Sequence, residues 1–164
     1  QLCDYLEDEA TAPAIRRRIP LVLVSCRSPL AREALFRCLR DDSFIVRARC
    51  GSALDKLTAT APDDRLSDER VYDVVLWELS VQAGAREARV DDRYSPTGQL
   101  AHVGVLLGLV LGDSAKTAFR ALRDGDGPLR SHALEYLDTV LPRPVWARLS
   151  GRIEPPSKGV ERVR

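Results

Sequence analysis

Residue types that mark several protein classes are scarce in this chain of 164 residues. Aromatic residues make up 5% of it, and methionine is absent. So few aromatics are more typical of Leu, Val and Ala packed between helices than of a β-sheet, where aromatic side chains are enriched. Because no initiator methionine is present and the chain opens within a helix-like pattern, we expect it to be part of a longer protein.

The motifs of metal and phosphate chemistry are also missing. The two histidines are His102 and His132, and the four cysteines stand far apart with no CxxC pair. A structural zinc ion usually takes four ligands from two closely spaced pairs, and a phosphate loop needs a glycine-rich run of fixed spacing. Residues 124–127 lack the twelve-residue ligand sequence of a calcium loop. The sequence therefore predicts no metal, no cofactor, no enzymatic activity and four reduced thiols.

Charge and hydropathy argue against nucleic acid and membrane insertion. The formal net charge of +1 gives no global field that would hold a polyanion. The longest apolar run, residues 103–111, is about half of a membrane span, and the first residues do not form a signal-peptide pattern. We therefore expect a cytoplasmic chain, which can still belong to a membrane-anchored parent.

The chain is rich in helical periodicity. Leu35, Phe36 and Leu39 form an apolar stripe within residues 30–40, and the acidic turn 41–43 follows. A second stripe consists of Val46, Cys50, Ala53, Leu54 and Leu57. Spacings of three and four place each set on one face of a helix. The two segments therefore predict an antiparallel helical hairpin.

This pattern recurs 83 residues later. Phe36, Leu39 and the pair 46–47 align with Phe119, Leu122 and the pair 129–130. Both copies read as helix, acidic turn, aliphatic–Arg pair and helix. A partial echo at residues 5–23 precedes them, with its first helix cut short. Such self-similarity is the sequence signature of a solenoid, in which each hairpin buries its apolar face against its neighbours.

Longer helices are expected between the two copies. Ser67 or Asp68 can cap a helix that carries an apolar stripe to residue 79 and can extend to residue 89. The next helix spans residues 99–111, after a break at 91–96. Its Gly104 and Gly108, with Gly112 at the end, fall every four residues, which predicts the close approach of a neighbouring helix.

The C-terminal part of the pattern defines the expected domain. Asp113 or Ser114 is expected to cap the helix that contains Phe119, and a last short helix is expected at residues 145–149. The run 154–159 is rich in proline, glycine and charge, which is typical of disorder. We thus predict one all-α domain over residues 1–150 and a disordered tail over residues 151–164.

Residues 31–57 and 116–141 resemble HEAT repeats, including the subset labelled phycobilin-lyase-like. The resemblance rests on REALFRCLRDDSFIVRARCGSALDKL and AFRALRDGDGPLRSHALEYLDTVLP, in which the acidic turn and the aliphatic–Arg pair are the matching positions. It implies a right-handed α-solenoid of antiparallel hairpins. The phrase LRSHALEYLDTVLP is also similar to the end of HEAT regions in large bacterial proteins. Some of these carry a nucleotide-carrier-like membrane domain of the major-facilitator type, which would make this chain a cytosolic C-terminal part.

Two acid–arginine pairs lie at these matching positions. They are Asp41 with Arg47 and Asp124 with Arg130. In HEAT arrays these positions form a ladder between adjacent repeats, and turn aspartates also cap helices. We therefore predict that the four residues are structural and not catalytic.

The predicted function is a non-enzymatic scaffold that binds another protein through the exposed face of the second helices. Arg16, Arg17, Arg49 and Lys56 are the candidate partner contacts. Three adjacent arginines at residues 16–18 cannot all face one ligand, because successive helical positions point about 100° apart.

Two alternatives remain open at the level of the sequence. The family label suggests a lyase acting on a linear tetrapyrrole, for which Glu135 and Tyr136 are the acidic and aromatic neighbours. His132 and Glu135 share a helix face, but no third ligand or catalytic partner accompanies them. A HEAT-fold nucleic-acid-binding module is the other alternative, which the net charge of +1 disfavours.

Overall fold

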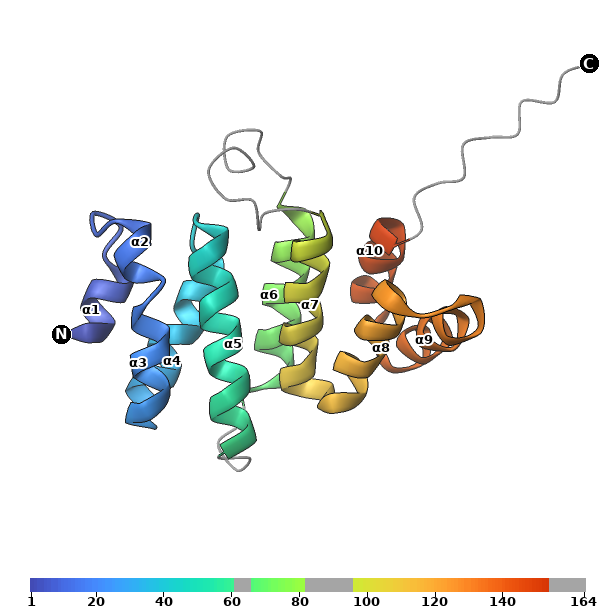
Figure 1. Ribbon diagram of the computed structural model, residues 1–164, viewed down its shortest axis with the longest axis horizontal. Coiled ribbons are helices and arrows are strands. Elements are labelled where there is room, and N and C mark those ends of the chain that lie inside the picture. The colour runs from blue at the N-terminus through green and yellow to red at the C-terminus, as the bar shows by residue number, and fades with distance from the viewer. Residues whose placement is uncertain (61–65, 82–95, 154–164) are drawn as a thin grey trace, which may run out of the picture.

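The computed structural model describes residues 1–60, 66–81 and 96–153, and every regular element within these ranges is a helix. The prediction of an all-α fold is therefore confirmed. In Figure 1 the helices follow one another along the long axis, from α1 at one end to α9 at the other. They are α1 (Leu2–Glu7), α2 (Pro13–Arg16), α3 (Ile19–Cys26), α4 (Pro29–Arg37), η1 (Cys38–Arg40), α5 (Phe44–Thr60), α6 (Asp68–Ser80), α7 (Pro96–Leu111), α8 (Asp113–Asp124), α9 (Gly127–Val140) and α10 (Arg143–Ile153).

The first predicted hairpin consists of α4, η1 and α5. The Ser28 hydroxyl caps α4 by accepting a hydrogen bond from the Ala31 amide, and Pro29 takes the first helical position, where its missing N–H costs nothing. In the turn, the Asp41 carboxylate accepts a bond from the Ser43 amide at 2.9 Å. Both apolar stripes are buried, so the 3.6-residue period correctly identified the inward faces.

The N-terminal echo forms the three short helices α1, α2 and α3, where the sequence predicted one truncated helix, a turn and a second helix. Residues 17 and 18 form a turn between α2 and α3, and Pro20 lies in the first turn of α3. Proline lacks the amide hydrogen for an intrahelical hydrogen bond. It is therefore tolerated in the first turn of a helix but not in the interior of one.

The glycine spacing of α7 allows α8 to pack closely against it. A Cβ atom on Gly104 would lie 2.7 Å from Cγ of Phe119, and one on Gly108 would lie 2.8 Å from Cε of Lys116. Any larger residue at either position would have to displace these side chains. Gly112 has a φ of 71° and is itself the N-cap of α8, where the sequence predicted Asp113 or Ser114. The positive φ, which glycine adopts without strain, produces the sharp turn between the two helices.

The second copy of the pattern lies at the end of the molecule and is less buried than the first. Leu129 is 55% exposed, whereas its counterpart Val46 is fully buried. Leu129 is exposed because α9 lies at the end of the molecule: α8 packs on one side of α9, and the far side of α9 faces outward (Figure 1). The Asp126 carboxylate caps α9 by accepting a bond from the Leu129 amide at 3.1 Å.

The last helix is longer than predicted. Residues 151–153, which the sequence assigned to a disordered tail, form the final turn of α10, and Ile153 is buried. The helix packs back on α6, where Arg152 donates a hydrogen bond to the Leu79 carbonyl at 2.9 Å. A single cluster of buried apolar side chains extends from Leu6 to Ile153. The rest of the predicted tail lies outside the described residues. The predicted extension of the helix to residue 89 is wrong, because α6 ends at Ser80 and Val81 has an extended backbone.

Candidate functional site

A buried ion pair joins α5 of the first hairpin to the next helix, α6. Arg47 on α5 donates from Nε to Oε2 of Glu78 on α6 at 2.8 Å, and both side chains are at most 1% exposed. The same guanidinium donates from Nη1 to the carbonyls of Asp41 and Asp42 at 2.7 and 3.0 Å, and it lies 5.4 Å from the Trp77 ring centroid. Arg47 therefore has the structural position that the sequence predicted. Its carboxylate partner is Glu78, on α6, and not Asp41.

Two residues of α7 complete this buried cluster. The Gln99 amide donates to the Glu78 carbonyl at 2.7 Å, and the His102 ring contacts Phe44 edge to face. Nε2 of His102 lies 4.0 Å from the Glu78 carboxylate. Burial, together with the charge of Arg47, lowers the pKa of His102 from 6.5 to about 3, so its imidazole is neutral at physiological pH. These groups form a polar cluster within the core and line neither of the cavities described below.

Arg16 has a structural position, and the prediction that it contacts a partner is wrong. It is 4% exposed and forms an ion pair with Asp41, while its Nε donates to the Leu6 carbonyl at 2.7 Å. The bond to Asp41 joins α2 to the turn of the first hairpin. Asp41 is thus structural as predicted, but Arg16 occupies the position expected for Arg47.

The second predicted pair, Asp124 with Arg130, does not form. Asp124 accepts bonds from its exposed neighbour Arg123, at 2.7 Å for the closer contact. Arg130 instead donates to the carbonyls of Leu122 and Ile153, in the last turns of α8 and α10. Carbonyls at a helix C-terminus carry partial negative charge and attract cations, which explains why Arg130 points to them.

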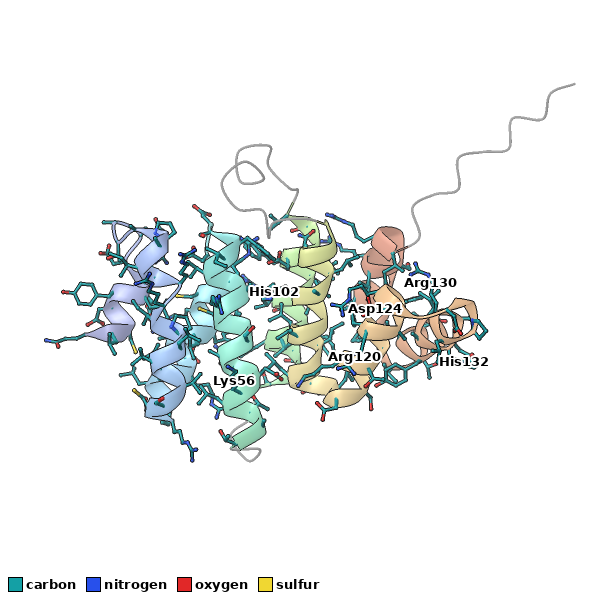
Figure 2. All side chains as sticks on the ribbon, in the orientation of Figure 1. Lys56, His102, Arg120, Asp124, Arg130 and His132 are labelled. Carbon is teal, nitrogen blue, oxygen red and sulfur yellow. The ribbon has the colours of Figure 1, made fainter. Side chains whose placement is uncertain are left out.

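The other three candidate partner contacts do not form one patch. Arg17 follows α2 and is exposed, Arg49 on α5 is half-buried, and Lys56 is exposed. Lys56 lies in the C-terminal half of α5, away from the end that α2 contacts (Figures 1 and 2). The arrangement therefore leaves Arg17 and Lys56 as separate surface cations.

Two of the four free cysteines lie together in the core. Cys38 and Cys50 are buried, and their thiols share a hydrogen bond that lowers the pKa of Cys38 and raises the pKa of Cys50. No three side chains of the His, Cys, Asp and Glu types come together as possible metal ligands within the described ranges.

A groove of about 520 Å³ opens between α7 and α8, and we call it the α7–α8 groove. Arg130 of α9 and Ile153 of α10 also line it. Its apolar walls consist of Leu100, Ala101, Gly104, Val105, Phe119, Leu122 and Ile153. The α7 residues at 100, 101, 104 and 105 share one helix face, as do those of α8 at 116, 119, 120 and 123. The groove thus lies between one face of each helix.

The polar residues of the groove are all basic. They are Lys116, Arg120, Arg123 and Arg130, and none of the described residues that line the groove is acidic. Lys116 is neutralised by Asp55 at 2.7 Å and by Asp113 at 3.2 Å, and its bond to Asp55 raises its pKa. Arg120 is exposed and has no salt bridge within the described part of the chain.

Sequence reasoning missed three of these four basic residues, and it predicted a different role for Arg130. The available signal was the segment KTAFRALR, in which Lys116, Phe119, Arg120 and Arg123 recur at helical spacing. A second, shallower hollow of about 480 Å³ lies between α8 and α9, with Tyr136 and His132 in its wall.

No protein-family model matches the chain, and comparisons with curated proteins and with solved structures find no significant match. Across the described ranges, no helix combines the length and the apolar character that a bilayer span requires.

Proposed function

We propose that this chain is a non-enzymatic protein-interaction scaffold and that the α7–α8 groove binds the partner. We also propose that its helices form a right-handed α-solenoid of HEAT-like hairpins. The groove carries the proposal, because it combines an apolar wall with an open side and a volume in the range of ligand sites, roughly 300–1,000 Å³. Its polar residues are arginines and a lysine, which recognise anionic groups.

Neither alternative gains support from the groove. A tetrapyrrole lyase would need acidic and aromatic groups that face one ligand. Glu135 is exposed on α9, and Tyr136 borders the other hollow. Binding to duplex nucleic acid calls for a broad basic face, whereas the basic side chains here border an apolar wall.

The location in the cell forms part of the same proposal. We place the chain in the cytoplasm, as the HEAT-like part of a longer bacterial protein. The support is the resemblance of residues 31–57 and 116–141 to HEAT repeats, together with four cysteines that form no disulfide.

A matched pair of substitutions tests the groove. Ala101 is an exposed residue of its wall, so Ala101→Trp should fill it without changing the core. Ala147 is exposed on α10 outside the groove, and Ala147→Trp is the control. Peptides selected from a random displayed library on the full chain should lose binding to Ala101→Trp and keep binding to Ala147→Trp. Selection of no peptide, or equal binding to both variants, would refute the proposed function.

A further inference from the structure

We infer that the groove takes a peptide segment in which an acidic side chain lies next to an apolar anchor. This inference rests on the proposed function and specifies its partner. The chain as a whole is nearly neutral, at +1, yet the groove is lined by four cations and by none of the acidic residues that the structure describes. The charge is therefore a local property of this site.

The four cations differ in how fully they are neutralised. Lys116 has two carboxylate partners, and Arg130 bonds to carbonyls at two helix C-termini, whose dipoles offset part of its charge. Arg123 pairs with Asp124, but both side chains are 55% exposed, so a ligand carboxylate can compete for it at little cost. Arg120 forms no salt bridge in the described ranges. Asp124, whose pKa is lowered first by its hydrogen bond to Arg123, interacts with Arg120 only through its charge, so Arg120 is the principal anion contact.

One wall of the groove is entirely apolar. The wall on α7 carries no charged side chain, whereas the basic side chains come from α8 and α9. Figure 2 shows Arg120 and Arg130 on this side of the molecule, away from Lys56. A segment that binds here would place an apolar side chain against Leu100, Val105 and Phe119. Its carboxylate would then point towards Arg120.

Other occupants fit less well. Residues 154–164 of the chain itself contain three basic and two acidic side chains, so their charge does not complement the groove. A nucleic acid would leave the apolar wall without a matching surface. An acidic peptide with an aromatic or aliphatic residue satisfies both the wall and the cations.

The test uses peptides selected on the full chain from a random dodecapeptide library displayed on phage. The enriched sequences should combine Asp or Glu with Phe, Leu or Trp. Synthetic copies should bind Arg120→Glu at least about tenfold more weakly than the unaltered chain, because a reversed charge replaces attraction by repulsion. Arg17→Glu and Lys56→Glu are matched controls with the same kind of charge reversal at exposed sites outside the groove, and they should bind the peptides normally.

A charge exchange separates the failure of this inference from that of the proposed function. Peptides in which Asp or Glu is replaced by Lys should bind Arg120→Glu better than they bind the unaltered chain. The inference alone would be overturned by neutral or basic peptides that lose binding to Ala101→Trp but bind Arg120→Glu as well as they bind the unaltered chain. The inference and the proposed function would both be overturned by peptides that bind Ala101→Trp as well as the unaltered chain, or by a chain that binds duplex DNA and no peptide.

Discussion

Acidification should destabilise this protein through His102. The unfolded chain binds a proton at this residue near pH 6.5, whereas the folded chain does so only near pH 3. The folded pKa is lowered, so the stability contributed by neutral His102 is present above pH 6.5. It is progressively lost as the pH falls towards 3. The ring is buried between Phe44 and Glu78 and is 4% exposed, so bulk solvent cannot stabilise a positive charge on it.

The expected loss of stability follows from the two pKa values. Between about pH 7 and pH 5 the linkage relation gives a decrease of about 2 kcal/mol in the free energy of unfolding. The result depends little on the folded value, because any folded pKa below about 4 leaves the native imidazole unprotonated at pH 5. A loss of this size is a large fraction of the stability of a small domain, about 5–15 kcal/mol.

Urea unfolding followed by circular dichroism at several pH values measures this loss. His102→Phe keeps a flat ring against Phe44 but cannot titrate, so its stability should fall by about 2 kcal/mol less over the same interval. The exposed His132 provides the control, and His132→Asn should keep the full pH dependence. If acidification instead stabilised the protein, the Glu78 carboxylate at 4.0 Å would be pairing with protonated His102, and the reasoning from burial would be refuted.

Two further predictions concern the arginines. Arg47→Met should lower the free energy of unfolding by about 3–5 kcal/mol, because it leaves the fully buried Glu78 carboxylate unpaired. In urea denaturation, the double variant Arg47→Met with Glu78→Leu should recover most of this loss. If the losses of the two single variants simply add in the double variant, the pairing is contradicted. Arg16→Ala should likewise destabilise the protein by a few kcal/mol, whereas Arg17→Ala should change its stability by less than about 0.5 kcal/mol. Similar urea midpoints for these two alanine variants would show that the ion pair of Arg16 with Asp41 contributes little.

Local patterns in the sequence were sufficient to identify the helices of the first hairpin. Apolar residues recur every three or four positions within 30–57, with a polar turn at 41–43. This pattern correctly predicted α4, α5 and their inward faces, because a helix buries residues at that spacing. The glycines of α7 likewise predicted a close neighbour. Helix ends were less accurate: the last turn of α10 contains Gly151, which local composition assigned to the tail, but packing of Ile153 against the core stabilises the helix there.

Only the tertiary structure decided which charged residues pair and where the groove lies. Arg47 was recognised as structural, yet its partner Glu78 is 31 residues away, and the sequence contains several nearer carboxylates. Arg16 shows the same effect, because it is buried against a turn 25 residues further along the chain. The α7–α8 groove exists only because one face of α7 and one face of α8 meet residues from α9 and α10. Periodicity reports the inward face of one helix at a time, whereas ion pairs and cavities depend on distances between elements that are far apart in the sequence.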